Sequence, residues 1–187
     1  MARRFSNCIG FDDGPFARDH EGDVLLVGVV CARTRLDGVL TGRVRKDGDD
    51  ATGRMREMIR ASQFDDHIQA VLLKGIAVAG FNVVDVHALA RDLGVPVLVV
   101  ARRPPDLTAI RRALARVPDG ERKWDRIERA GPMEPLDKLW VQRVGLSTAE
   151  ARALLRSTNL HGNLPEPLRL AHLIAGGVAS GISRGQA

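Results

Sequence analysis

Cysteine, lysine and long apolar runs are all scarce in this chain of 187 residues. The two cysteines, Cys8 and Cys31, are too few for a disulfide framework, and both lie in apolar runs where a free buried thiol is the usual state. The longest apolar run, Val24 to Ala32, is too short to span a bilayer, and no apolar segment follows the charged N-terminus. We therefore expect one soluble, cytoplasmic domain over residues 1–187, with no membrane partner.

Lysine accounts for only four of the 28 basic residues, so the other 24 are arginines. The net charge of +5 and the sequence pI near 10.0 fit a polyanionic partner. Arginine binds phosphate through two parallel hydrogen bonds, which favours nucleic acid. A GC-rich genome produces the same excess of arginine without any functional meaning, and composition alone leaves both explanations open.

Strand patterns dominate the first part of the chain, and helices alternate with strands in the rest. Alternating or continuous apolar runs predict strands at residues 5–11, 24–32 and 36–46, joined by short links into an antiparallel meander. Strands at 68–73 and 95–100 follow, with helices at 51–62, 82–93, 107–117, 148–156 and 164–178, and residues 138–144 form a possible edge strand. Residues 119–137 are expected to be an irregular surface segment. The simplest topology is an α/β fold with a mixed five-stranded sheet of order 3-2-1-4-5 and helices on both faces, which is a ribonuclease H-like layout.

Two adjacent carboxylates, Asp12 and Asp13, follow the first strand and precede a Gly14-Pro15 turn. Carboxylates at a rigid strand end are suitable ligands for a hard divalent cation such as magnesium. An Asp pair that hydrogen-bonds to its own turn is the alternative. The last helix carries a second polar feature, because Glu166, Arg169 and His172 follow one another at i, i+3 spacing on an otherwise apolar helix. Such a stripe either serves a site or is satisfied internally, for instance by an ion pair between Glu166 and Arg169 and a core histidine at His172.

Five motifs resemble those of the endonuclease dU family, which is distantly related to endonuclease V. They are IGFDDGPF at 9–16, KDGDDAT at 46–52, GIAVAGFN at 75–82, RRPPDL at 102–107 and LPEPLRLAH at 164–172. The resemblance covers nearly the whole chain and implies a metal-dependent endonuclease that nicks DNA near deaminated bases, uracil for this family and hypoxanthine for its relative. It also implies Mg²⁺ or Mn²⁺ as cofactor. By the same resemblance, Asp12, Asp47 and Asp50 are the expected metal ligands, and Asp12 and His172 are the expected catalytic residues.

One residue departs from the family pattern. The strand at 68–73 is followed by Lys74, where the family typically has an aspartate that is an expected metal ligand. Neighbouring strands lie about 4.8 Å apart, so the Lys74 ammonium should lie beside Asp12 and form an ion pair where the metal would bind. We therefore expect nuclease activity to be impaired or lost.

Three functions remain open from the sequence. The first is the metal-dependent nuclease, and the second is a catalytically inactive nucleic-acid-binding protein of the same fold. The third, a small-molecule-binding α/β domain, has little support because residues 75–80 lack the spacing of a phosphate-binding loop. Four arginines are candidates for nucleic-acid contacts: Arg102, Arg103, Arg169 and Arg184. The alternative is a solvated side chain for Arg102 and Arg103, the ion pair with Glu166 for Arg169, and a disordered terminus for Arg184.

Overall fold

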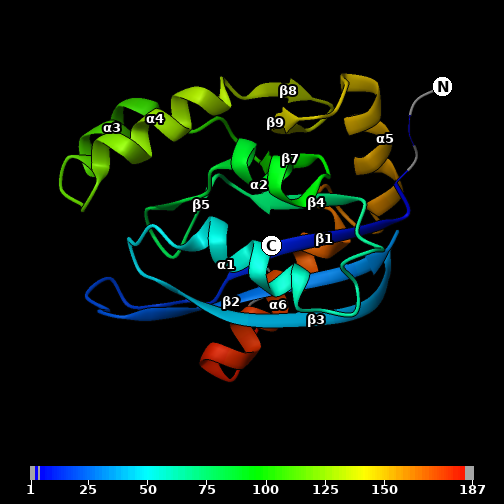
Figure 1. The fold of residues 1–187 in the computed structure, drawn as a ribbon, viewed down its shortest axis with the longest axis horizontal. Helices are drawn as coiled ribbons and strands as arrows, with labels where there is room; N and C mark the ends of the chain where they lie inside the picture. Colours follow the sequence, from blue (N-terminus) through cyan, green and yellow to red (C-terminus); the bar gives the residue numbers. More distant parts are fainter. Residues whose placement is uncertain (1–2, 4, 184–187) are drawn as a thin grey trace.

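The computed structural model describes residue 3 and residues 5–183, and within them the chain forms a mixed α/β fold (Figure 1). The strands are β1 (Asn7–Asp13), β2 (Asp23–Ala32), β3 (Arg35–Arg45), β4 (Ala70–Lys74), β5 (Ala77–Val78), β6 (Asn82–Val83), β7 (Val97–Ala101), β8 (Glu134–Leu136) and β9 (Leu139–Val144). The helices are α1 (Ala51–Arg60), α2 (Val86–Leu93), α3 (Leu107–Leu114), α4 (Gly120–Ala130), α5 (Thr148–Thr158) and α6 (Glu166–Ser180).

The main sheet has the order β3-β2-β1-β4-β7-β9-β8. Its first five strands follow the expected 3-2-1-4-5 order, with β1 antiparallel to β2 and parallel to β4. The expected number of five strands is wrong, since β9 pairs with β7 and β8 pairs with β9, which extends the sheet to seven. β9 is therefore an inner strand rather than the edge strand that its sequence suggested.

Two elements differ from the sequence expectation. The segment at 82–93 begins with the short strand β6 rather than with a helix, because Asn82 pairs with Val78 of β5 and its buried side chain is held by hydrogen bonds. The segment at 119–137, expected to be irregular, contains the eleven-residue helix α4 and the strand β8. In α4, Trp124 and Ile127 are apolar anchors in a mostly charged sequence, and they pack with Val83 and Leu114.

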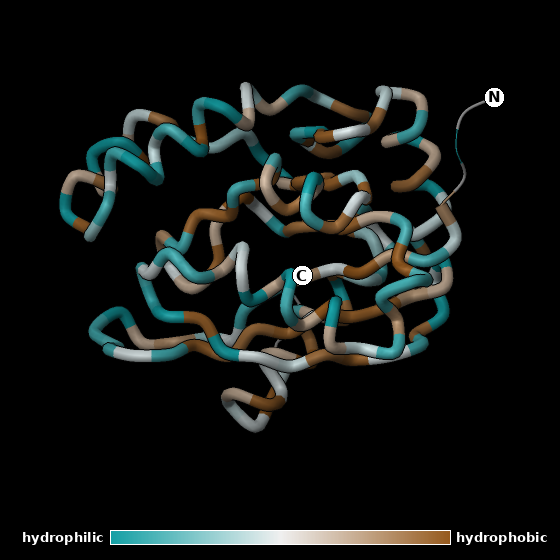
Figure 2. Tube along the Cα trace, in the orientation of Figure 1, coloured by the Kyte–Doolittle hydropathy of each residue, from teal (hydrophilic) through white to brown (hydrophobic). Residues whose placement is uncertain are grey.

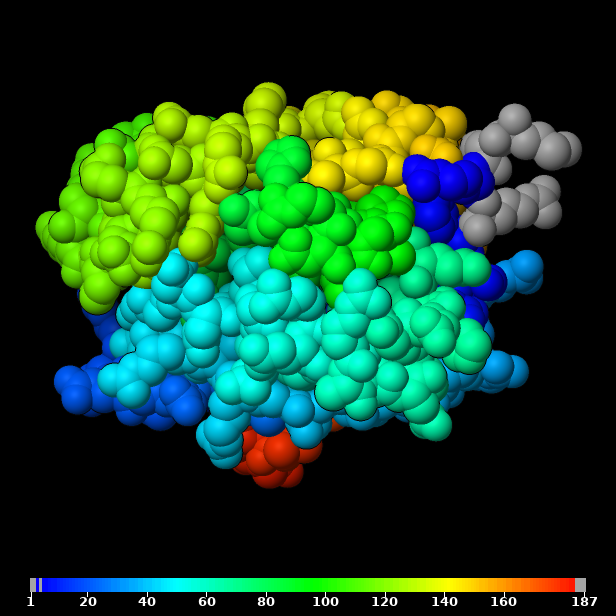
Figure 3. All heavy atoms as spheres, in the orientation of Figure 1, coloured from blue at the N-terminus to red at the C-terminus, as the bar shows by residue number. Residues whose placement is uncertain are grey.

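Helices cover both faces of the sheet, as expected. On one face α1 and α2 pack through Met55, Ile59 and Leu89 onto alternate strand residues such as Ile9 and Phe11. Figure 3 shows the cyan and green segments that contain these helices at the front of the molecule, with the red C-terminal segment projecting below them. On the other face α5 and α6 pack onto the strand residues whose side chains point to that side, such as Cys8 and Leu72. The hydropathy colouring in Figure 2 accordingly places the long hydrophobic stretches along the central strands.

Among the described residues, no helix combines the length and apolar character needed to cross a bilayer.

Candidate functional site

The alternation of β1 and β4 directs Asp12 and Lys74 to the same face of the sheet. In β1, Cys8 packs on the face covered by α5 and α6, and Asp12 follows four residues later, so its side chain points the same way. In β4, Leu72 packs on that face, and Lys74 follows two residues later. The parallel register pairs Phe11 with Leu73, and the next step along both strands brings Asp12 beside Lys74.

A close approach of α6 to β1 brings His172 to the same place. Gly10 allows this approach, because a Cβ at this position would lie 2.6 Å from the backbone carbonyl carbon of Pro167. Leu168, in the first turn of α6, is fully buried against the sheet, and His172 lies one helical turn further along the same side. The helix thus directs an imidazole at the carboxyl end of β1.

Asp12, Lys74 and His172 form one polar cluster. The Lys74 Nζ atom lies 3.3 Å from Asp12 Oδ2, and His172 Nδ1 lies 2.9 Å from the same oxygen. His172 Nδ1 is also 3.2 Å from Lys74 Nζ. If the neutral imidazole carries its hydrogen on Nε2, Nδ1 accepts a hydrogen bond from the ammonium; if the hydrogen is on Nδ1, the ring donates to Asp12. A cation therefore already neutralises the Asp12 carboxylate, which is 6% exposed.

Asp13 lies in the same cavity but has different partners. Its Oδ2 accepts a hydrogen bond from the backbone N–H of Ala79 at 3.0 Å, and it makes no ion pair with Lys74 among the described contacts. Burial, followed by the charge of Asp12, raises the pKa of Asp13 from 3.8 to about 6. The two adjacent carboxylates therefore differ, since Asp12 is charge-paired whereas Asp13 resists ionisation.

The cluster opens into a cavity of about 720 Å³, which is large enough for a nucleotide-sized ligand. Phe16 from the turn after β1 forms one wall, and the C-terminal end of α6 contributes Gly176 and Ser180. Phe16 ends the motif at 9–16, but residue type alone does not identify it, or Gly176 and Ser180, as part of a cavity wall, because an aromatic residue in a turn and small residues in a helix have many structural uses.

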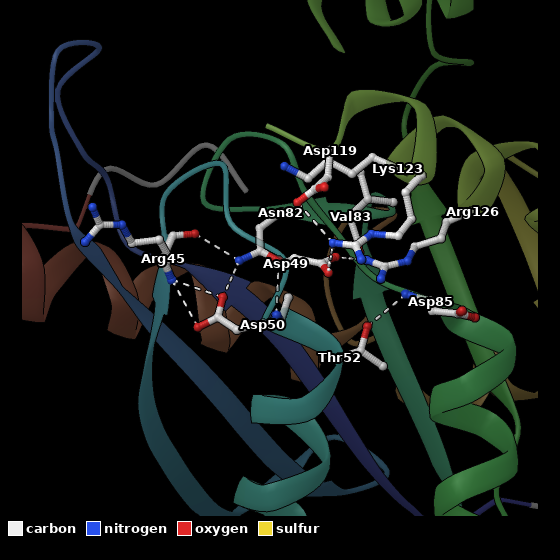
Figure 4. Close-up of polar contacts among 12 residues, drawn as sticks. Arg45, Asp49, Asp50, Thr52, Asn82, Val83, Asp85, Asp119, Lys123 and Arg126 are labelled. Atoms are coloured by element: carbon white, nitrogen blue, oxygen red, sulfur yellow. Dashed lines mark hydrogen bonds and ion pairs between the residues drawn. The ribbon is translucent and has the colours of Figure 1, made fainter. Parts of the chain in front are cut away.

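The structure places Asp50 in a different network, shown in Figure 4. The Asp50 carboxylate accepts hydrogen bonds from the backbone N–H of Arg45 and, at 2.6 Å, from Nδ2 of the buried Asn82. Asp50 precedes α1, but its side chain makes no capping bond with the helix, and Asn82 Oδ1 accepts the N–H of Ala51 instead. Asp50 therefore joins β3, α1 and β6, which is a structural role.

Asp47 is also engaged away from Asp12. Asp47 has a left-handed backbone conformation, with φ 53°. Its Oδ1 accepts a hydrogen bond from the backbone N–H of Phe81 at 2.8 Å. Its carbonyl oxygen accepts a hydrogen bond from Lys123 Nζ at 2.6 Å. Lys123 is fully buried, and this burial lowers the pKa of its ammonium. Asp49, two residues after Asp47, forms an ion pair with Arg126, as Figure 4 shows.

These donors do not fit the metal centre that the resemblance implies. Within the described part of the chain, no three His, Cys, Asp or Glu side chains are grouped so that they could hold a metal ion. Asp12 faces an ammonium rather than further oxygen ligands, whereas Asp47 and Asp50 use their oxygens for backbone and amide hydrogen bonds. A divalent cation would have to displace Lys74 from Asp12 in order to bind.

The candidate phosphate-binding arginines are in different environments. Arg102 and Arg103 are exposed just after β7, at the sheet edge where β4 also ends. Arg169 forms a two-bond ion pair with Glu166, at 2.8 and 2.7 Å, and Glu166 is 2% exposed. This pair satisfies the first half of the polar stripe on α6 internally, while His172 reaches the cavity. Arg184 lies outside the described residues.

Relatives of known sequence match almost the whole chain. A UPF0215 protein from Deinococcus radiodurans is 56% identical over 184 residues, which cover 98% of this chain and 94% of the relative. Another, from Methanothermobacter thermautotrophicus, is 45% identical over 184 residues, with 96% and 90% of the two chains covered.

Solved structures share the fold. A crystal structure of a protein of unknown function from Archaeoglobus fulgidus has a TM-score of 0.87 and 32% identity, covering 93% of this chain and 98% of that one. Ciona intestinalis endonuclease V, solved with a 24mer DNA containing an inosine followed by a ribo-adenosine, has a TM-score of 0.58 and 14% identity, covering 91% and 88%. This second likeness concerns the fold alone. A family model described as endonuclease dU matches residues 4–179, so the chain belongs to the endonuclease dU family, as its motifs predicted.

Proposed function

We propose that this protein binds nucleic acid containing a deaminated base at the cavity formed by Asp12, Lys74 and His172, and that it does so without a resident metal ion. The observation that carries the proposal is the position of the Lys74 ammonium, 3.3 Å from Asp12 and 3.2 Å from His172. Three observations support a nucleic-acid partner. The chain belongs to the endonuclease dU family, its net charge is +5, and it shares its fold with an endonuclease V that was solved with inosine-containing DNA. The β3-β2-β1-β4-β7 order supports a ribonuclease H-like core.

In this role Lys74 is the phosphate contact within the cavity. A lysine ammonium attracts a phosphate as a compact point charge, and Lys74 retains 32% exposure of its side chain toward solvent. Arg102 and Arg103, at the neighbouring strand end, extend the positive charge along the same edge of the sheet. A deaminated base pairs poorly, so it costs less to extrude toward the cavity than a normal base.

Binding is tested by fluorescence anisotropy with labelled duplexes that contain uracil, hypoxanthine or neither, in buffer with EDTA. The proposal predicts binding without metal, a preference for the deaminated duplexes, and weaker binding by Lys74→Gln. Lys138→Gln is the matched control, because Lys138 lies in the turn between β8 and β9, away from the cavity. Binding that requires Mg²⁺ or Mn²⁺ would contradict the proposal.

The second candidate is the Mg²⁺- or Mn²⁺-dependent nuclease that nicks DNA at deaminated bases. The observation in its favour is the adjacent pair of carboxylates, Asp12 and Asp13, in one open cavity. A nicking assay separates the two functions. The nuclease predicts cleavage by the wild type that Asp12→Ala abolishes, whereas the binding function predicts little cleavage by the wild type and a gain in Lys74→Asp, which restores a carboxylate.

A further inference from the structure

Lys74 differs from every other lysine of this chain in its surroundings. The Lys46 ammonium donates to the carbonyl oxygen of Arg18 at 2.6 Å, and Lys123 is fully buried against Asp47. Lys138 is exposed in a turn. Only Lys74, of the four, lies in the 720 Å³ cavity next to an acid and an imidazole.

An amine in such a setting is suited to covalent chemistry with a carbonyl compound. A lysine amine attacks an aldehyde to form an imine, provided that a neighbouring group takes the ammonium proton and another protonates the departing hydroxyl. His172 Nδ1, 3.2 Å from Lys74 Nζ, is placed to accept the first proton. Asp12 Oδ2, within 3.3 Å of the amine and 2.9 Å of the imidazole, holds both groups in place.

DNA supplies an aldehyde of suitable size at an abasic site, where the sugar opens to expose C1′. Loss of the base removes its stacking and pairing, so this nucleotide leaves the duplex at lower cost than an intact one. The cavity is open enough to admit a sugar and its phosphates, and a second carboxylate, Asp13, lies in it without an ion pair to Lys74.

We propose that Lys74 forms an imine with the C1′ aldehyde of an abasic site in DNA and that the protein then cleaves the strand by β-elimination, without a metal ion. This inference rests on the proposed function in one respect, namely that DNA enters this cavity.

The steps balance without an oxidant or reductant. His172 Nδ1 takes a proton from the Lys74 ammonium, and the free amine joins C1′ through a new carbon–nitrogen bond. The proton then returns from His172 to the resulting hydroxyl, which leaves as water, so that a protonated imine remains. A base in the cavity, which we assign to Asp13, removes a proton from C2′. Those electrons form the C2′–C3′ double bond as the C3′–O bond breaks, and the 3′ phosphate leaves with the downstream strand. Water then hydrolyses the unsaturated imine, which releases the aldehyde and restores Lys74.

The test is reductive trapping with cyanoborohydride on a duplex that contains one abasic site, with EDTA present throughout. Reduction converts the imine into a stable secondary amine, which is seen as a protein–DNA adduct on a denaturing gel. Since the chain has only four lysines, mass spectrometry of the digested adduct locates the modified amine. The proposal predicts an adduct on Lys74 and its loss in Lys74→Arg, which keeps the positive charge beside Asp12 but cannot form the imine.

Two further variants sharpen the result. Lys138→Arg should give the wild-type adduct yield, because Lys138 lies away from the cavity. Asp13→Asn should still form the adduct but release less cleaved strand when no reductant is present, which separates imine formation from elimination. An adduct on another lysine or on the N-terminal amine, or equal adduct yields from wild type and Lys74→Arg, would overturn the proposal.

Anisotropy with the same abasic duplex distinguishes the failure of this inference from failure of the proposed function. Tight binding without any adduct would overturn the imine chemistry and leave the proposed function standing. Absence of binding to abasic, uracil and hypoxanthine duplexes alike would overturn both.

Discussion

Asp13→Asn should make the protein more stable at neutral pH. The native carboxyl group has a pKa of about 6 against 3.8 for an ordinary Asp, a difference of about 2 pKa units, and at 1.36 kcal/mol per unit this corresponds to about 3 kcal/mol. Because the folded pKa is raised, the folded state holds a proton that the unfolded state has lost between pH 3.8 and about 6. The stability contributed by this proton is present below pH 3.8 and is lost as the pH rises through about 6.

An asparagine removes this ionisation but keeps the native contact, since its side-chain oxygen can still accept the N–H of Ala79. Urea unfolding at pH 7 should therefore show the variant to be more stable by about 3 kcal/mol, and the difference should nearly vanish at pH 4. Asp66→Asn, at an exposed position, is the control for a general loss of negative charge. A variant less stable than the wild type at pH 7, or a stability difference that does not depend on pH, would contradict the raised pKa of Asp13 as the cause.

Three other substitutions test the framework of the site. Asn82→Ala should lower the free energy of unfolding by about 2–4 kcal/mol, because the buried side chain forms hydrogen bonds with Arg45, Asp50 and Ala51. A decrease below about 1 kcal/mol in urea unfolding would show that this network is dispensable. Gly10→Ala should cost about 1–3 kcal/mol by forcing α6 away from β1. Its control is Gly53→Ala in α1, where an added Cβ meets nothing within 4 Å and should stabilise the folded protein by about 0.5–1 kcal/mol. Equal melting temperatures for the two variants would contradict the close approach of α6 to β1. Lys74→Asp should have a lower melting temperature than the wild type in EDTA, because it leaves Asp12 without its cation and adds a like charge. Mn²⁺ at 100 times its Kd should restore about 2.7 kcal/mol of the variant's stability. A melting temperature that does not change with Mn²⁺ would contradict metal binding by the variant.

The order of the first five strands could be predicted from the sequence because hydrophobic periodicity and connection length restrict it strongly. A continuous apolar run such as Val24 to Ala32 is expected to be an inner strand, as β2 is, and crossover helices require parallel neighbours. The additional strand β8 could not be predicted, because its three residues, with Pro135 in the middle, carry no alternation. Helix α4 was missed because its apolar anchors are few and its charged residues resemble those of a loop.

The candidate site was predictable only in part. The predicted pairing of the first strand with the strand at 68–73 placed Asp12 beside Lys74, and the structure has them as an ion pair. The sequence could not show that the oxygens of Asp47 and Asp50 are occupied, because their partners, the N–H of Phe81 and the amide of Asn82, come from the hairpin of β5 and β6, which is distant in sequence. Asp13 was likewise indistinguishable from Asp12 in sequence. Their environments differ because Asp12 pairs with Lys74, whereas Asp13 accepts the backbone N–H of Ala79 from the loop between β5 and β6.

The Lys74 ammonium pairs with Asp12, the carboxylate that the family resemblance assigns to a metal ion. Calorimetric titration of the wild-type protein with Mn²⁺ tests it most directly, with Lys74→Asp measured in parallel. We expect no saturable binding heat for the wild type and a distinct binding isotherm for Lys74→Asp. Saturable Mn²⁺ binding by the wild type that disappears in Asp12→Ala would contradict it.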